Sequence, residues 1–306
     1  MRSSKWFVFT LYLVLAACVP VQETPRLPGS GLRVLAAESF LADIVQNVAG
    51  SRARVDSLVP PGLDPHTFEP TPQDIVRITN SDIVVLNGGG LETWSQNIFE
   101  NIGGNQLVIE ASKGLTSRQP EEGAGDLHDH EGDPHFWLDP NLVIDYVENI
   151  RAGLIQIDPA GESAYRQNAV AYTQQLKELD AWIRIQTVQI PPERRLLVTN
   201  HESFGYFADR YGFRVVGAVI PSVSAGASPS AQQMAELINR IRSTGAPAIF
   251  LEVGANPQLA DQISAETGAK VITNLNTHTI PTDIVFGSGY IAMMKANVTT
   301  IVDALK

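Results

Sequence analysis

Short runs of β-branched residues alternate with amphipathic helical patterns along most of the chain. The first run covers Leu32–Ala37, and the segment after it places Phe40, Ile44 and Val48 at four-residue spacing. This spacing keeps the three side chains on one helix face, whereas a short uninterrupted apolar run is typical of a strand buried on both faces. Strands that alternate with helices in this way predict parallel sheets with helices on both faces.

A long helical stretch divides this alternation into two blocks. Between Gly161 and about Gln189 the chain has no glycine or proline, and apolar residues recur every three or four positions. About 25 helical residues at 1.5 Å each reach roughly 37 Å, the width of a domain. We therefore predict an α/β fold with two lobes built on parallel sheets, residues 32–158 and 193–306, joined by one long rigid helix within 159–192.

The first 31 residues are predicted to be a targeting segment and a tether. Arg2 and Lys5 precede an apolar run of about a dozen residues, which is too short to cross a bilayer and is typical of a signal-peptide core. Small residues then precede Cys18, the only cysteine, as in a lipoprotein signal. We expect a signal peptide over 1–17, lipidation of Cys18 and a Pro/Gly-rich tether over 18–31. A plain secretory signal with a chance cysteine is the alternative.

Four of the six histidines occupy similar places in the predicted fold. His66, His201 and His278 follow predicted strands, and His135 lies in a proline-fixed turn before a helix. Ligands bind beyond the carboxyl ends of strands in open α/β sheets, so two histidines from each lobe would face the cleft between the lobes. A single loop histidine is usually a surface residue. Four together indicate a metal site, because imidazole nitrogens bind zinc well and four ligands fill a tetrahedral shell.

Several segments resemble motifs of one known family. They are GLDPHTFEPTPQDI, NGGGLETW, DPHFWLDP, TNHESFGYFADRYGF and FGSGYIAMMKANVTTIVDAL. With them the chain resembles the cluster A-I (ZnuA/TroA-like) substrate-binding lipoproteins of ABC metal importers, over nearly the whole mature chain. The resemblance implies two Rossmann-like lobes bridged by a long helix, metal capture and no enzymatic activity. It also implies that His66, His135 and His201 are metal ligands.

The fourth ligand position departs from the family pattern. Family members usually carry aspartate or glutamate there, whereas the gap-free register places His278 at this position. A different alignment places Asn274 there and would leave a site of three histidines. Glu252 and Asp283 are nearby carboxylates that could bind the ion in place of His278 or beside it.

The donor atoms favour zinc. Imidazole suits zinc, whereas carboxylate suits manganese and magnesium, so we expect Zn²⁺ and regard Mn²⁺ as less favoured. Copper and nickel stay open, since imidazole accepts both. The acid-rich segment Gly123–Asp133 contains His128 and His130, and we expect it to be a weak auxiliary collector of cations. A solvated acidic loop without a metal role is the alternative.

Together these features predict an extracytoplasmic binding protein that captures zinc between its lobes and delivers it to an ABC permease and its ATPase. We expect a lipid-anchored monomer without a nucleic-acid partner, because the net charge of −11 does not suit nucleic acid. The alternatives are a manganese binder of the same family, an adhesin or siderophore-type binder, and a zinc enzyme with three histidines and an open water position. Against the enzyme, the chain has no HExxH pair and no GxSxG elbow.

Overall fold

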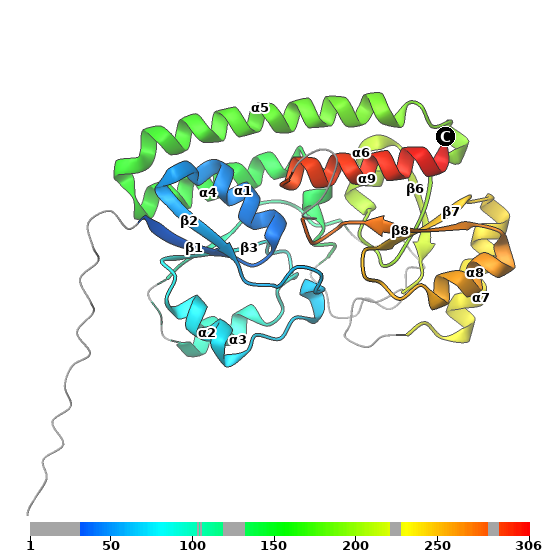
Figure 1. The fold of residues 1–306 in the computed structure, drawn as a ribbon, viewed down its shortest axis with the longest axis horizontal. Coiled ribbons are helices and arrows are strands. Elements are labelled where there is room, and N and C mark those ends of the chain that lie inside the picture. The colour runs from blue at the N-terminus through cyan, green and yellow to red at the C-terminus, as the bar shows by residue number, and fades with distance from the viewer. Residues whose placement is uncertain (1–30, 103, 105, 119–131, 221–227, 281–287) are drawn as a thin grey trace, which may run out of the picture. The chain divides into compact units, whose positions relative to one another are not determined.

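Two four-stranded parallel sheets organise the part of the chain that the structure describes. The computed structural model describes residues 31–102, 104, 106–118, 132–220, 228–280 and 288–306 (Figure 1). The strand orders are β2-β1-β3-β4 and β6-β5-β7-β8. The strands are β1 (Leu32–Ala36), β2 (Ala53–Ser57), β3 (Ile83–Leu86), β4 (Leu107–Glu110), β5 (Leu196–Thr199), β6 (Arg214–Ala218), β7 (Ala248–Glu252) and β8 (Lys270–Leu275).

Helices follow most of these strands, as the alternation predicted. Two of the described elements, α3 and β4, were not expected from the sequence. The helices are α1 (Ser39–Ala49), α2 (Pro72–Thr79), α3 (Ser95–Ile102), α4 (Leu142–Ile157), α5 (Glu162–Thr187), α6 (Gly205–Tyr211), α7 (Ala231–Thr244), α8 (Gln258–Thr267) and α9 (Tyr290–Leu305).

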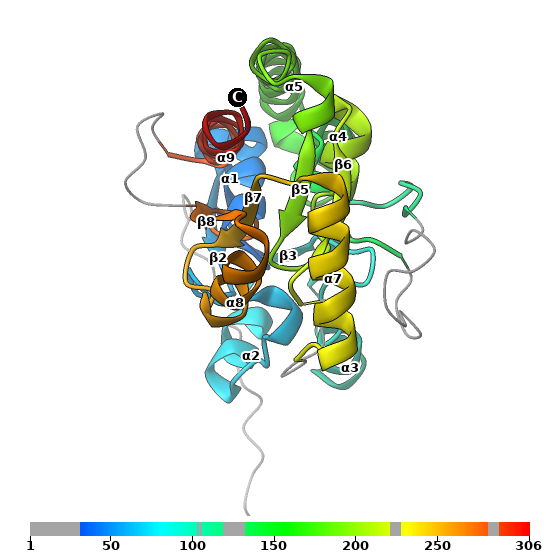
Figure 2. The same ribbon diagram turned by 90° about the vertical axis from the view of Figure 1, so that its right-hand side faces the viewer.

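Both faces of each sheet are covered by other elements. Because successive strand residues point to opposite sides, each strand contributes to two cores. In β1, Val34 packs into a core with α1 and α4, whereas Leu35 packs on the other side with α2 and α3. In β7, Phe250 belongs to the first of these cores, whereas Ile249 packs with α7 and α8. Figure 2 shows α7 and α8 beside the second sheet. One apolar core therefore continues from the first sheet into the second.

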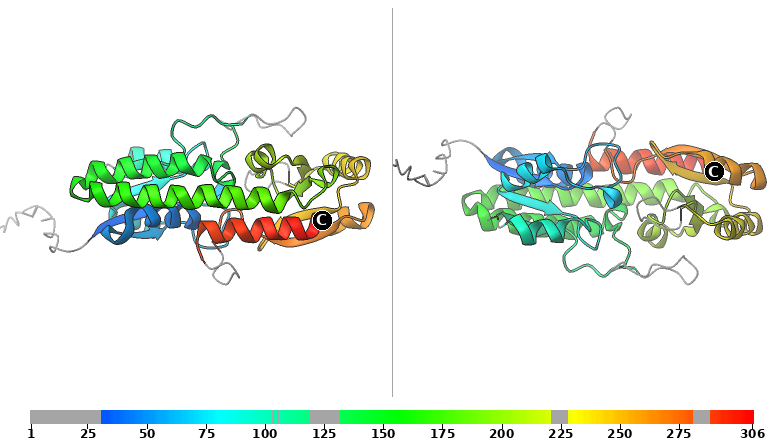
Figure 3. Two further views of the ribbon diagram at one scale, coloured as in Figure 1. Left: turned by 90° about the horizontal axis from the view of Figure 1, so that it is seen from above. Right: turned by 90° about the horizontal axis from the view of Figure 1, so that it is seen from below.

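The long helix α5 packs against elements from both halves of the described chain. Its buried stripe is the one expected from the sequence and runs from Tyr165 to Ile183. It contacts α1 and α4 on one part of its length and α6 and α9 on another, and Figure 3 shows it alongside α4 and α9. Two parallel-sheet lobes with a long helix are thus confirmed, and residues 31–306 form one compact unit. The lobe boundaries at residues 158 and 193 stay predictions.

Some expectations fall on residues outside the described ranges. These are the signal peptide, most of the tether, Cys18, His128, His130 and Asp283. Among the described residues, no helix is both long enough and apolar enough to cross a bilayer.

Candidate metal centre

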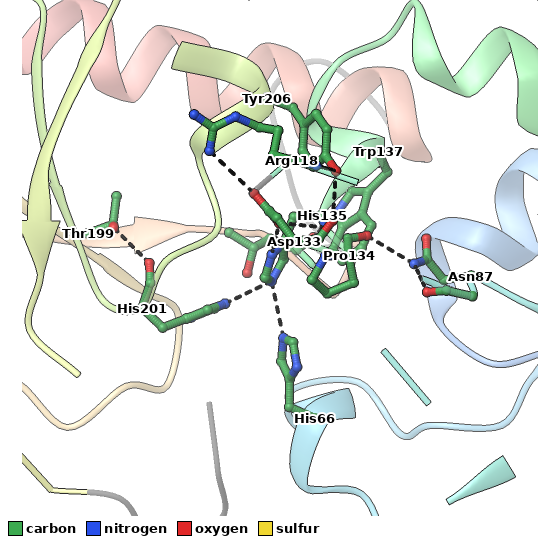
Figure 4. A network of polar contacts seen from close by, with 12 residues as sticks. His66, Asn87, Arg118, Asp133, Pro134, His135, Trp137, Thr199, His201 and Tyr206 are labelled. Carbon is green, nitrogen blue, oxygen red and sulfur yellow. Dashed lines mark hydrogen bonds and ion pairs between the residues drawn. The ribbon is translucent and has the colours of Figure 1, made fainter. Parts of the chain in front are cut away.

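Four histidine side chains from four separate segments converge on one point. One ring nitrogen from each of them lies within 4.8 Å of the corresponding nitrogens of the others. Nε2 of His135 lies 3.1 Å from Nε2 of His66 and 3.1 Å from Nε2 of His201 (Figure 4). The fourth member is His278, whose ring stacks on that of His201 at a centroid distance of 5.4 Å. The structure thus brings together the four histidines selected from the sequence, and their binding of a metal stays a prediction.

Two of the four histidines are held by short turns that follow strands. His66 lies in the 3₁₀ turn Pro65–Thr67 after β2, and its backbone N–H donates to the Asp64 side chain at 2.9 Å. His201 comes two residues after the end of β5, and its carbonyl accepts a hydrogen bond from the Thr199 hydroxyl at 2.7 Å. These local hydrogen bonds fix the backbone from which each imidazole projects.

His135 is held by the aspartate two residues before it. Oδ1 of Asp133 accepts the backbone N–H of His135 at 3.0 Å and lies 2.8 Å from its Nδ1. The Asp133 carbonyl accepts from the Tyr206 hydroxyl at 2.7 Å, and the Pro134 carbonyl accepts from the Asn87 amide at 3.0 Å (Figure 4). The turn that carries His135 is therefore anchored by side chains from both halves of the described chain.

Glu252, the last residue of β7, lies on the outer side of two of the rings. Its Oε1 is 2.8 Å from Nδ1 of His201, and its Oε2 is 3.3 Å from Nδ1 of His278. Nδ1 of His278 is also 2.9 Å from the Thr277 hydroxyl. Nε2 of His278 and Oε1 of Glu252 are buried, and neither has a hydrogen-bond partner among the described residues. Direct binding of a metal by Glu252 stays a prediction.

Burial and neighbouring charges set the protonation of this cluster. Burial lowers the pKa of His66 and of His135 well below the ordinary value, and charge on the neighbouring histidines would lower it further. Burial also disfavours charge on His201, but the Glu252 carboxylate outweighs it and raises the pKa of His201. Burial alone would raise the pKa of Glu252, yet His201 and His278 hold it well below the ordinary value. At neutral pH His66 and His135 are therefore neutral rings with a free lone pair.

Asp133 places a mostly buried carboxyl, 14% exposed, beside the cluster. Burial raises its pKa to about 7, although the His135 backbone N–H and the Arg118 charge act in the opposite direction. Sequence reasoning placed Asp133 in the acid-rich collector segment and missed its contact with the His135 ring. The signal that could have found it is the Asp-Pro-His spacing, which brings a carboxylate back onto the imidazole two residues on.

Access to the cluster differs among its members. His135, His201 and His278 are buried, whereas His66 is partly exposed. Of the four rings, His66 is therefore the most open to solvent.

The sequence and the fold match known metal-binding proteins. A family model described as "ZnuA: Zinc-uptake complex component A periplasmic" matches residues 34–304. The manganese-binding lipoprotein MntA of Halalkalibacterium halodurans is 34% identical over 301 residues, covering 97% of this chain and 96% of that protein. The iron-binding protein YfeA of Yersinia pestis is 33% identical over 271 residues, covering 88% of this chain and 85% of that protein.

Solved structures agree with the sequence matches. The periplasmic zinc-binding protein TroA of Treponema pallidum superposes with a TM-score of 0.78 at 31% identity, covering 90% of this chain and 99% of that one. A manganese-bound periplasmic metal-binding protein of Candidatus Liberibacter asiaticus gives a TM-score of 0.78 at 28% identity, covering 90% of this chain and 100% of that one.

Proposed function

The chain belongs to the ZnuA family of zinc-uptake components. We propose that four of its histidines bind a zinc ion, which the protein captures for an ABC importer. The family consists of solute-binding proteins of ABC metal transporters, and the chain is not an enzyme. The proposed ligands are His66, His135, His201 and His278.

The spacing of the ring nitrogens is the observation that carries this proposal. Zinc–nitrogen bonds of ~2.0–2.1 Å in a tetrahedral shell place the ligand nitrogens roughly 3.3–3.4 Å apart. The two Nε2–Nε2 distances at His135 are 3.1 Å, and all four donor atoms lie within 4.8 Å of one another. Small ring movements would therefore complete a tetrahedral shell around one ion.

The choice of zinc comes from the donor atoms. The relatives are named for manganese, iron or zinc, so membership of the family leaves the metal open. Four imidazoles favour zinc, because manganese prefers carboxylate, carbonyl and water oxygens. Manganese is the second candidate, favoured by the names of several relatives and by the Glu252 carboxylate beside two of the rings.

Delivery and location follow the family. We propose that the protein works outside the cytoplasm, held at a membrane by lipid on Cys18, and passes its ion to a permease served by an ATPase. Relatives named as lipoproteins of metal ABC transporters support this placement, as does the signal pattern before Cys18. The segment Gly123–Asp133, with His128 and His130, is proposed as a weak collector of cations.

Calorimetric titration of the chelator-treated protein tests the proposal. We expect one zinc ion per chain, and we expect manganese to bind more weakly and to be displaced by zinc. A site that binds manganese more tightly than zinc would favour the second candidate. Failure to bind any of zinc, manganese and iron would refute metal capture.

A further inference from the structure

We infer that Glu252 positions the C-terminal half of the site by fixing the tautomers of His201 and His278, so that the ion meets only imidazole Nε2 atoms there. The inference rests on the proposed zinc function and adds a positioning residue to it. A single carboxylate reaches both rings, with Oε1 2.8 Å from one Nδ1 and Oε2 3.3 Å from the other.

A neutral imidazole has two tautomers, and a neighbouring carboxylate selects one of them. A neutral imidazole carries one N–H, and a carboxylate beside Nδ1 keeps that hydrogen on Nδ1. Nε2 is then left with its lone pair, which is the form that binds a metal. Oδ1 of Asp133 lies 2.8 Å from Nδ1 of His135 and, once ionised, does the same for that ring. Three of the four rings thus have their outer nitrogen against a carboxylate.

The Nε2 atoms of two of these rings lie close together. Nε2 of His135 lies 3.1 Å from Nε2 of His201, and both rings have a carboxylate at Nδ1. In this assignment neither Nε2 carries a hydrogen, so two lone pairs face each other across a gap of that size. A cation between the two atoms would accept both lone pairs.

His278 has a second neighbour that could reverse its tautomer. The Thr277 hydroxyl lies 2.9 Å from Nδ1, and if it donated there, the ring would carry its hydrogen on Nε2. That N–H would be buried without an acceptor among the described residues, because Nε2 of His278 has no partner there. Burying an unpaired donor is unfavourable, so the Nδ1–H form, with Glu252 as acceptor, is the one that the surroundings stabilise.

The same contacts also affect which metals the site accepts. Each oxygen of Glu252 lies beside one Nδ1 while the rings keep these positions, and the approach of Oε1 is an ion-pair contact and not a hydrogen bond. The only carboxylate of β7 at the site is thereby used to orient nitrogen ligands. A carboxylate that orients imidazoles is not itself a ligand, which disfavours oxygen-preferring cations such as Mn²⁺. The two oriented imidazoles favour Zn²⁺.

Glu252→Gln separates orientation from packing, because it keeps the shape of the side chain. A glutamine can accept from one Nδ1–H, but its NH₂ group must face the other ring. Because this NH₂ group donates to Nδ1, that ring would carry its hydrogen on Nε2 and could no longer bind the metal through Nε2. We expect zinc affinity to fall about 10- to 100-fold, as for other outer-shell partners. Zinc-edge X-ray absorption should then report one imidazole fewer than in the wild type.

Asp82→Asn is the matched control. Asp82 is also buried and hydrogen-bonded, but it lies beside the amino end of β3, where it accepts from the Arg33 backbone N–H at 3.0 Å. We expect its zinc affinity and imidazole count to match the wild type. An equal loss in both variants would overturn the inference, because removing any buried carboxylate would then suffice. Circular dichroism of both variants checks that they fold.

A second measurement needs no variant and no metal. Long-range ¹H–¹⁵N NMR of the ¹⁵N-histidine-labelled, metal-free protein reports the tautomer of each ring at a pH high enough to leave His201 uncharged. Hydrogen on Nδ1 of both His201 and His278 is the expected result, and hydrogen on Nε2 of either ring overturns the inference. A wild-type protein that binds no zinc would instead refute the proposed function, while the tautomers would still test the role of Glu252.

Discussion

The indole Nε1 of Trp137 donates a hydrogen bond to the carbonyl of Thr277 at 2.7 Å, across 140 residues of sequence. Trp137 comes two residues after His135, and Thr277 comes directly before His278. The Tyr290 hydroxyl donates in turn to the Trp137 carbonyl at 2.6 Å. The segments that carry two of the proposed ligands are thus joined by buried hydrogen bonds.

Removing this link should loosen the site and weaken the fold. Trp137→Phe leaves the buried Thr277 carbonyl without its donor and leaves a small cavity, so the free energy of unfolding should fall by about 2–4 kcal/mol. Zinc affinity should fall as well, because His278 loses the anchor next to it. Urea unfolding and zinc titration measure the two effects. Trp182→Phe, on the partly exposed side of α5, is the control and should leave zinc affinity unchanged.

Replacing a proposed ligand should have a much larger effect on binding than replacing a histidine elsewhere. His66→Ala and His201→Ala each remove one of four imidazoles, and we expect each to weaken zinc binding by more than the ~10- to 100-fold typical of outer-shell partners. His128→Ala is the matched control and should change the affinity much less. Titration of the three variants under one set of conditions decides the matter, and equal losses would mean that the cluster has been confused with the acid-rich segment.

The contribution of two glutamates that are buried together should fall as pH rises. Burial, and then the charge of Glu92, raise the pKa of Glu38 well above its ordinary value of 4.5, and burial raises the pKa of Glu92 to about 7. Between the unfolded and folded pKa values the folded state binds more protons than the unfolded state. This contribution to stability is therefore present below about pH 4.5 and is lost as pH rises through the folded pKa values.

Glu38→Gln should remove this loss. Near pH 8 the variant should be more stable than the wild type by about 1–3 kcal/mol, and near pH 4.5 the difference should vanish. Urea unfolding at the two pH values measures the change, and Glu178→Gln, at an exposed position of α5, should show no such dependence. A variant that is less stable than the wild type near pH 8 would show that the Glu38 carboxylate is stabilised there.

Metal binding should involve little movement of the two sheets. The apolar core that includes Val34 of β1 also includes Phe250 of β7, and α5 contacts helices from both halves. Opening a wide gap would expose part of this core to water, which is unfavourable. Small-angle scattering with and without zinc should therefore give nearly the same radius of gyration. A large compaction on adding zinc would contradict this view.

Much of the fold could be predicted because the sequence pattern is local. The predicted strand Leu32–Ala37 became β1 with one residue fewer, and the stripe from Tyr165 to Ile183 is the buried face of α5. Thr71 lies directly before Pro72, a pattern typical of a helix start, and its hydroxyl accepts from the backbone N–H of Asp74. The edge strand β4 was missed because it has only four residues, of which one, Ile109, is buried.

The convergence of the four histidines could be predicted from the sequence, whereas the residues that position them could not. His66, His135, His201 and His278 each follow a strand or a stiff turn, so their meeting point follows from the topology of parallel sheets. The contact of Glu252 with two rings depends on which way a side chain at the end of β7 turns. The link from Trp137 to Thr277 likewise joins distant segments, and no local pattern in the sequence reports either contact.

The central claim is that imidazoles from both halves of the chain share one zinc ion. An anomalous-difference map at the zinc absorption edge, from crystals of the zinc-loaded protein, tests it most directly. The account predicts one strong peak within bonding distance of Nε2 of His66, His135, His201 and His278. A peak bound elsewhere, or no peak where these four side chains meet, would contradict it.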